Sequence, residues 1–174
     1  YEDTPLHRAN FIMLIKRQYF DEAIFYRVVE GFVIQGGDTD DEERLALRQE
    51  IGAYYVPAEF HAHHYHRKGM LAMARNYTDN PDKKSSPYIF YIVHGTKATP
   101  AELDAVQAEN GHAFPAAHRS YYTSAPGTPH LDGEHTVFGE VVEGLDVIDS
   151  IAAVKVDGGD WPINNVVMDI EILE

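Results

Sequence analysis

The stretch Phe25 to Asp38, FYRVVEGFVIQGGD, decides how the rest of the chain is interpreted. Two runs of β-branched and aromatic residues flank Glu30-Gly31, and Gly36-Gly37 closes the second run. This pattern predicts two antiparallel strands joined by a tight turn. Arg27 lies inside the first apolar run, where a half-buried guanidinium needs a carbonyl, a carboxylate or a ligand as its partner. The alternative is an arginine at the strand edge with its head group in water.

Composition narrows the class of protein. The 174 residues carry a formal net charge of −14 and no cysteine. A length of this order fits one domain, and we assign residues 1–174 to a single domain. The negative charge argues against nucleic acid as a partner, and the absence of cysteine excludes disulfides and zinc–thiolate sites. No apolar run is long enough to predict a membrane span.

Outside the hairpin, short strands broken by Gly, Pro and Asp dominate, which favours a barrel or sandwich with a few peripheral helices. Thr99-Pro100-Ala101-Glu102 has the form of a capping box. The acidic stretch 38–43 is predicted to be a loop, and residues 45–51 are ambiguous between secondary-structure types. We expect further strands over 69–74, 88–93, 136–142 and 166–173, and helices from Thr4-Pro5 to about residue 15 and over 100–109, 115–122 and 145–152.

Four segments in order resemble the cyclophilin family. Residues 25–38 resemble its signature, and residues 131–139, LDGEHTVFG, resemble its Leu-Asp-Gly block. Two shorter matches, 69–74 and 90–93, lie between them. The resemblance, closest to bacterial members, implies an all-β fold: a closed antiparallel eight-stranded barrel with two capping helices, here with a helical insert before His130. Family members place a β-hairpin ahead of the first helix, so we expect a barrel that lacks its N-terminal strands.

The resemblance also implies an activity, the cis/trans isomerisation of X-Pro peptide bonds in polypeptide substrates, without a cofactor or metal. Arg27 would donate to the prolyl nitrogen, and Gln35 would hold the substrate carbonyl or support the arginine. Ala74 and Arg75 would offer backbone groups to the peptide. The proline pocket and its rim would be formed by Phe32, Val33, Tyr91, His130, Leu131 and His135.

Each pocket assignment has a simpler alternative, since Phe32, Val33 and Leu131 could be plain core residues and His135 could be a turn residue at the Asp132-Gly133 bend. A strict two-residue turn at 30–31 would place Arg27 and Gln35 on opposite faces of the hairpin. A bulge or a looser turn would bring them together.

The sequence departs from the family pattern at four positions. Tyr26 replaces a histidine, Arg75 replaces an asparagine, and Ile89 replaces a glutamine that touches the substrate backbone. His130 stands where members that bind cyclosporin tightly carry a tryptophan. These changes put affinity and the preference for the residue before proline in doubt.

The histidine tract 61–66, HAHHYH, could bind zinc, copper or nickel. Glu59 is the one carboxylate near it in the sequence, so we expect no specific metal site. Three hypotheses stay open: an active foldase, a catalytically weak proline-peptide-binding module with the same fold, and a metal-binding domain. Arg27 and Gln35 favour the first. We expect a monomer, in the cell envelope or periplasm, with the cytoplasm left open.

Overall fold

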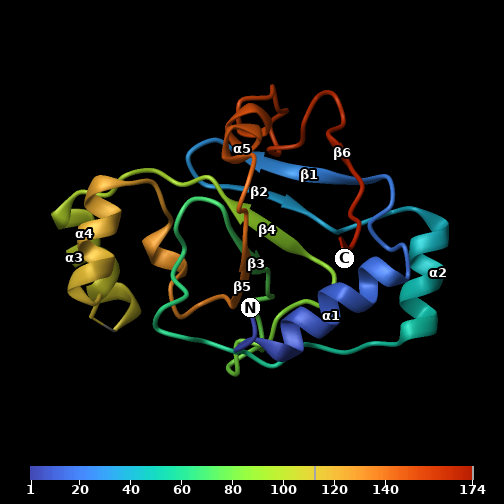
Figure 1. The fold of residues 1–174 in the computed structure, drawn as a ribbon, viewed down its shortest axis with the longest axis horizontal. Helices are drawn as coiled ribbons and strands as arrows, with labels where there is room; N and C mark the ends of the chain where they lie inside the picture. The colour runs from blue at the N-terminus through green and yellow to red at the C-terminus, as the bar shows by residue number, and fades with distance from the viewer. Residues whose placement is uncertain (112, 174) are drawn as a thin grey trace.

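The protein was analysed as a computed structural model that describes residues 1–111 and 113–173, and its centre is an antiparallel sheet (Figure 1). The strand order is β5-β3-β4-β2-β1-β6, with each strand antiparallel to its neighbours. The strands are β1 (Ala23–Val29), β2 (Val33–Gly36), β3 (Met70–Met73), β4 (Phe90–Val93), β5 (Val137–Glu140) and β6 (Val167–Met168). The helices are α1 (Pro5–Lys16), α2 (Glu42–Ile51), α3 (Pro100–Asn110), α4 (Ala116–Ser124) and α5 (Leu145–Ala152), with a 3-10 turn η1 (Pro129–Leu131).

The expectation of an all-β, closed eight-stranded barrel is not confirmed. The described part of the chain forms an open sheet of six strands with β5 and β6 at its edges. The helices hold more residues than the strands. The predicted strand over 166–173 pairs only at Val167 and Met168, because β1 offers it just Ala23 and Ile24 as partners. Alternation of apolar residues sets which side chains are buried, but a strand also needs a neighbour along its length.

The two faces of the sheet serve different cores. On β4, Phe90 and Ile92 pack into a large cluster with Leu14 of α1 and Ile148 of α5. Tyr91 alternates with them and joins a second cluster on the opposite face. The other buried members of this second cluster are Val33, Met70, Ala72, Val93, Leu131 and Val137. Because side chains on a strand alternate between faces, Gln35 of β2 shares the face of Val33.

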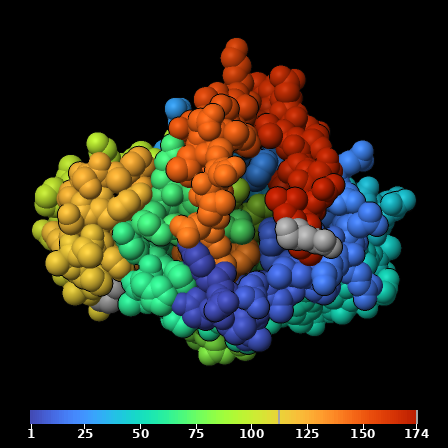
Figure 2. All heavy atoms as spheres, viewed as in Figure 1, coloured from blue at the N-terminus to red at the C-terminus, as the bar shows by residue number. Residues whose placement is uncertain are grey.

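The helical insert expected before His130 is present as α3 and α4. The Thr99 capping box forms as predicted, with the Thr99 hydroxyl accepting from the Glu102 N–H and the Glu102 carboxylate accepting from the Thr99 N–H. Leu103, Phe114 and Tyr122 form a small core of their own. Figures 1 and 2 show this insert as a lobe at one end of the molecule, far from α2.

The stretch 38–51 divides differently from the prediction. The loop ends at Asp41, whose carboxylate accepts the Arg44 N–H at 3.0 Å, and α2 begins at Glu42. The N-cap bond explains why an acidic stretch starts a helix, since Asp is favoured at this position and acidic residues are stabilised in the first turn. The ambiguous residues 45–51 are therefore helical. Among the described residues no helix is long and apolar enough to span a membrane.

Candidate active site

The β1–β2 hairpin places Arg27 directly opposite Gln35. Val29 pairs with Val33, so the turn contains three residues and not two, with Gly31 at φ +78°. A three-residue hairpin loop commonly needs a left-handed residue, and glycine adopts that conformation without steric cost. The longer turn shifts the register by one residue and makes Arg27 and Gln35 cross-strand partners. They consequently lie on one face of the hairpin, which the three-residue turn allows and a strict two-residue turn would not.

A hollow of about 300 Å³ lies on this face of the sheet. Nine of the ten residues predicted for the site line it: Arg27, Phe32, Val33, Gln35, Ala74, Arg75, Tyr91, Leu131 and His135. Tyr77 is the further member of the lining. The floor is apolar, since Val33, Tyr91 and Leu131 are all buried. One charged donor beside an apolar, partly enclosed floor is an arrangement that can hold a small ring and act on a polar group next to it.

Arg27 is held from two sides. Its Nε lies 3.4 Å from Asp160 Oδ2, and its Nη1 lies 3.5 Å from Gln35 Oε1. The guanidinium also lies 5.7 Å from the centre of the Phe32 ring. The Asp160 backbone is tied to the same strand, because its carbonyl accepts the Val28 N–H at 2.9 Å. The ion pair engages Nε, while Nη1 reaches Gln35, which lines the hollow together with Arg27.

Tyr26 takes over the support of Gln35. Tyr26 is the extra residue of a β-bulge in β1: Phe25 pairs with Gly36 and Arg27 with Gln35, which leaves Tyr26 unpaired between them. The Gln35 Nε2 donates to the Tyr26 hydroxyl at 2.5 Å. Trp161 packs against the Tyr26 ring with 5.9 Å between centroids. Burial raises the pKa of Tyr26, so the hydroxyl stays neutral and can serve as this acceptor.

His135 and Tyr77 form one wall of the hollow. The His135 Nδ1 donates to the Met73 carbonyl at 3.1 Å, so the Nε2 is free to accept from the Tyr77 hydroxyl at 2.7 Å. Burial lowers the pKa of His135 to about 4. The imidazole is therefore neutral near pH 7 and keeps this tautomer.

Tyr91 is fixed from behind by a buried polar network. Its hydroxyl lies 3.0 Å from His66 Nε2, and His66 Nδ1 lies 2.9 Å from Asp132 Oδ1. The same Asp132 oxygen accepts the His66 backbone N–H, and Tyr122 donates to the carboxylate at 2.8 Å. Burial raises the pKa of Tyr91 well above its usual value. A fully bonded network of this kind holds its members in one arrangement.

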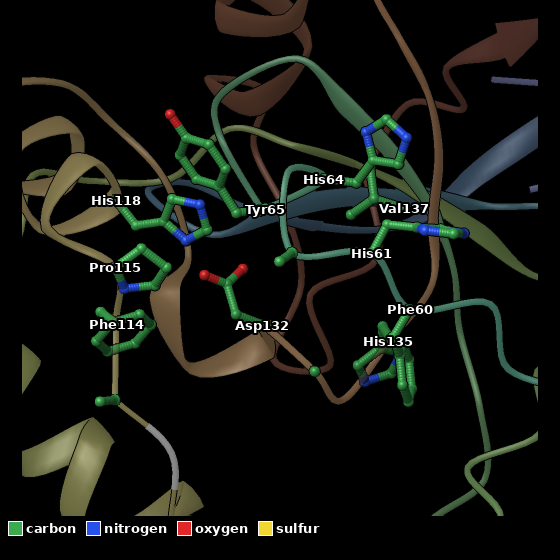
Figure 3. Close-up of a pocket in the computed structure, with 13 residues that line it drawn as sticks. Phe60, His61, His64, Tyr65, Phe114, Pro115, His118, Asp132, His135 and Val137 are labelled. Carbon is green, nitrogen blue, oxygen red and sulfur yellow. The ribbon is translucent and has the colours of Figure 1, made fainter. Parts of the chain in front are cut away.

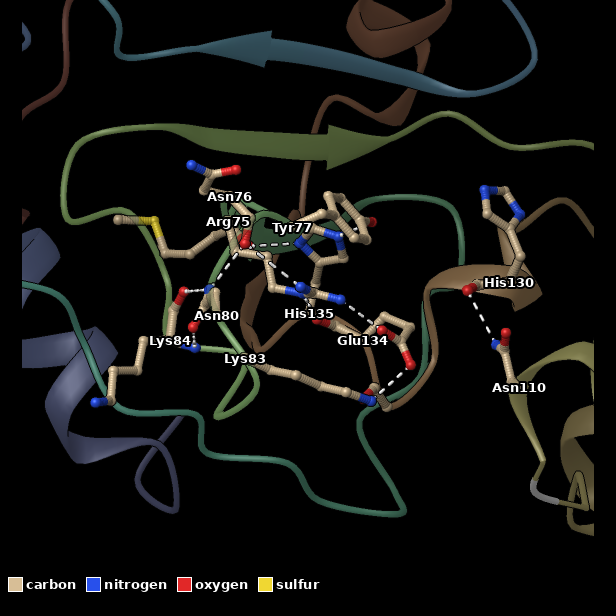
Figure 4. A network of polar contacts seen from close by, with 12 residues as sticks. Arg75, Asn76, Tyr77, Asn80, Lys83, Lys84, Asn110, His130, Glu134 and His135 are labelled. Carbon is tan, nitrogen blue, oxygen red and sulfur yellow. Dashed lines mark hydrogen bonds and ion pairs between the residues drawn. The ribbon is translucent and has the colours of Figure 1, made fainter.

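Arg75 builds the outer wall of the site with its side chain (Figure 4). Its Nε donates to the Glu134 carbonyl at 2.7 Å and its Nη2 to the Glu134 carboxylate at 2.6 Å. Lys83 binds the other carboxylate oxygen at 2.6 Å. Burial alone would raise the pKa of Glu134, but the hydrogen bonds from Lys83 and Arg75 lower it. The guanidinium also stacks 4.0 Å from the centre of the Tyr77 ring.

The two backbones expected to face a peptide differ. Ala74 is already engaged, since its N–H donates to the Ile89 carbonyl at 2.9 Å and its carbonyl accepts from Ser86 at 2.8 Å. Within residues 1–111 and 113–173, no hydrogen bond engages the backbone N–H or C=O of Arg75. The exposed peptide group therefore belongs to Arg75, and Ala74 contributes surface to the hollow.

His130 is the predicted site residue that does not line the hollow. Its ring is exposed and stacks on Phe32 with 5.3 Å between centroids. Its carbonyl accepts from Asn110 of α3 at 3.1 Å, which ties the helical insert to the rim (Figure 4). His130 thus lies beside the site and contacts it through the Phe32 ring.

A second cavity of about 230 Å³ lies between the sheet and the helical insert (Figure 3). His61 and His64 of the histidine tract line it, together with His118 of α4 and His135. Glu59, the carboxylate that the sequence offered to the tract, is instead bonded to His7 Nδ1 at 2.7 Å. The histidine tract therefore splits, with His66 in the buried network behind Tyr91, His61 and His64 half-buried, and His63 exposed.

Sequence reasoning missed Tyr77, His66, Asp132 and Asp160 as site components. Asp132 and His66 lie within segments that had been quoted for other reasons, and no spacing rule links them. Asp160 reaches Arg27 from the hairpin before β6, where the Val156–Pro162 bridge folds the loop back. A tyrosine shortly after the Ala74 strand is the one sequence signal that could have indicated Tyr77.

Comparison with known proteins agrees with this geometry. Residues 1–171 match the family described as cyclophilin type peptidyl-prolyl cis-trans isomerase/CLD. A Staphylococcus aureus protein provisionally named a peptidyl-prolyl cis-trans isomerase is 32% identical over 166 residues, covering 95% of this chain and 79% of that protein. A Streptococcus pyogenes protein with the provisional name bifunctional phosphatase/peptidyl-prolyl cis-trans isomerase is 33% identical over 176 residues. This chain spans about a third of the Streptococcus protein, 35% of its length.

The fold is also found among solved structures. A Cryptosporidium parvum cyclophilin type isomerase, crystallised in the presence of the dipeptide Ala-Pro, superposes with a TM-score of 0.64 at 21% identity. The match covers 97% of this chain and 84% of the other.

Proposed function

This chain belongs to the cyclophilin-type peptidyl-prolyl cis-trans isomerase family, and from that premise we propose that it rotates X-Pro bonds in polypeptides and so assists protein folding. The observation that carries the proposal is the convergence of Arg27 and Gln35 on one hollow with an apolar floor. Both polar groups come from neighbouring strands, whose register fixes their separation.

The reaction needs a donor and little else. An amide resists rotation because its nitrogen shares a lone pair with the carbonyl, which gives a barrier of about 18–20 kcal/mol. In the twisted transition state that lone pair is localised on the prolyl nitrogen. A fixed donor binds this state better than either planar isomer, and the difference lowers the barrier. Arginine is suited to the role because its charge is permanent and its N–H groups lie in a fixed plane.

Each part of the site then has a task. Phe32, Val33 and Leu131 would receive the proline ring, and Arg27 would aim an Nη–H group at the prolyl nitrogen. Gln35 would hold the substrate carbonyl while Tyr26 fixes its amide. The free backbone groups of Arg75 would pair with the extended peptide on the N-terminal side of proline. The mechanism uses these groups alone and forms no covalent intermediate.

The test is an isomerisation assay on a short Ala-Pro or Phe-Pro peptide. Arg27→Ala should lower kcat/KM by about 10²–10³, the usual effect of removing one preorganised donor. Arg27→Lys keeps the charge but loses the planar fork, so we expect most of the activity to be lost there as well. Arg17→Ala is the matched control, because Arg17 is an exposed arginine whose guanidinium pairs with Glu50 at the surface, away from the hollow. Activity near that of the unmodified protein in Arg27→Ala would refute the mechanism.

A second candidate function, a weak proline-peptide-binding module, is favoured by one observation. Ile89, immediately before β4, has an apolar side chain and offers no polar side-chain group to a substrate. If the unmodified, folded protein binds a proline peptide in calorimetry but gives no measurable isomerisation, this second function holds. We further propose one isomerase domain over residues 1–174, acting as a monomer and without nucleic acid.

A further inference from the structure

Three side chains from two distant segments converge beside the first turn of α1. Asp3 Oδ2 lies 2.6 Å from His63 Nε2, and Asp3 Oδ1 lies 2.8 Å from His64 Nε2. One potential ligand atom from each of the three residues lies within 4.8 Å of the others. We propose that Asp3, His63 and His64 form a binding site for a divalent transition-metal ion of the zinc or nickel type.

The donor set and its spacing fit such an ion. Imidazole nitrogen and carboxylate oxygen are ligands that Zn²⁺ takes at about 2.0–2.2 Å, so two ligands of a tetrahedral site lie about 3.4 Å apart. The two Asp3–histidine separations, 2.6 and 2.8 Å, are somewhat shorter than that value, and all three atoms lie within 4.8 Å of one another, so the side chains would move apart slightly to admit the ion. Two histidines and one carboxylate complete three positions, and a fourth remains for water or for a nearby histidine.

His61 is placed to supply that fourth position. Its ring centre lies 5.6 Å from that of His63 and 5.9 Å from that of His64. Its Nε2 lies 2.6 Å from the backbone carbonyl of Asp3, on the same side of the cluster. To bind the ion, this nitrogen would exchange its contact with the Asp3 carbonyl for a metal bond.

The site is held together before any ion binds. The Tyr1 ring stacks on His64 with 3.9 Å between centroids and 2° between planes. The Glu59 carboxylate accepts the N–H groups of Leu6 and His7, each at 3.0 Å, and so ties the start of α1 to the loop that carries the histidines. Sequence reasoning offered Glu59 as the one carboxylate for the tract, but Glu59 is bonded to His7, and the carboxylate that reaches the histidines is Asp3, 60 residues from His63.

Access and charge also favour a cation. The His63 side chain is 65% exposed, so an ion can reach the cluster from solvent, whereas His64 is 11% exposed and gives a fixed inner ligand. The chain's net charge of −14 attracts cations to its surface as a whole.

The competing explanation is a clip without metal, in which protonated histidines pair with Asp3. The two are separated by titrating the full chain, free of any polyhistidine tag, with ZnCl₂ and separately with NiCl₂ in a calorimeter. We expect one ion per chain and a rise in Tm on binding, because the ion cross-links residues 1–3 to the loop at 61–64. No saturable binding, or no change in Tm at saturating metal, would overturn the proposal.

Variants locate the ion. Asp3→Asn keeps the size of the side chain and removes a ligand, and His63→Ala removes a ring that is 65% exposed. Each should weaken binding more than tenfold, since even outer-shell changes cost about 10–100-fold. His118→Ala is the matched control, because His118 lines the neighbouring cavity outside the cluster. Equal affinities in Asp3→Asn, His63→Ala and His118→Ala would show binding elsewhere and refute the site.

Discussion

Asp132→Asn should lower both the stability and the activity of the protein, although Asp132 does not line the hollow. The carboxylate is buried and accepts the His66 N–H at 2.9 Å, His66 Nδ1 at 2.9 Å and the Tyr122 hydroxyl at 2.8 Å. A hydrogen bond to a charged group contributes about 1.5–3 kcal/mol and a neutral one about 1 kcal/mol. Weakening the three bonds, and turning an amide N–H₂ toward donors, should together cost about 3 kcal/mol. For a chain of this length that lowers Tm by roughly 6–12 °C.

The same change should slow catalysis, because His66 is the partner of the Tyr91 hydroxyl in the floor of the hollow. The measurements are thermal unfolding and peptide isomerisation at a temperature where the variant is folded. Asp104→Asn is the control: its carboxylate pairs with Arg119 at 2.7 Å on the exposed surface of α3, where such a pair contributes at most about 1 kcal/mol. If Asp132→Asn melts within about 2 °C of the unmodified protein, the network does not contribute the stability estimated here.

Two further predictions concern histidines of the site. Stability should fall as the pH drops from 6.5 to about 4. In this range the unfolded chain protonates His135 at its ordinary pKa of 6.5, whereas in the folded protein the pKa of His135 is about 4. The free energy of unfolding should therefore decrease by about 3 kcal/mol across this range. His135→Gln should remove that part of the slope in urea unfolding between pH 7 and 4, and an unchanged slope would contradict the assignment. Cyclosporin should bind weakly, and His130→Trp should bind it more than about tenfold tighter by widening the apolar plate next to Phe32. Equal affinities in calorimetry, or a dissociation constant near 1 nM for the unmodified protein, about −12 kcal/mol, would show that this position does not limit binding.

Elements with strong local signals could be predicted from the sequence. The Thr99 capping box fixed the start of α3, and α5 was predicted over the residues that form it. The β1–β2 hairpin was predicted as well, but the sequence did not settle its register. One additional residue in a turn moves every side chain of a strand to the other face, and local propensity hardly distinguishes a two-residue from a three-residue turn around Gly31.

Contacts between distant segments could not be predicted in the same way. Asp160 reaches Arg27, and Asp3 reaches the histidine tract, only because tertiary packing brings separate loops together. No spacing rule covers such pairs. The strand expected at 166–173 fails for the same reason. Its apolar residues do alternate with exposed ones, but pairing stops after Met168, because Met168 pairs with Ala23, the first residue of β1.

The departures from the family pattern affect different parts of the reaction. The change from histidine to Tyr26 in β1 is compensated, because the Tyr26 hydroxyl accepts a hydrogen bond from the Gln35 amide and Trp161 packs against the Tyr26 ring. The change at Arg75 is likewise accommodated, since its guanidinium binds Glu134 while its backbone N–H and C=O make no hydrogen bond within the described residues. Ile89 has no such replacement. In the proposed mechanism, Arg27, the donor to the prolyl nitrogen, is therefore retained, while one polar contact with the peptide is lost. A loss of ground-state and transition-state binding alike raises KM and leaves kcat little changed. The chemical step should thus be preserved in this chain, and substrates that fill the apolar floor and pair with the Arg75 backbone should be preferred.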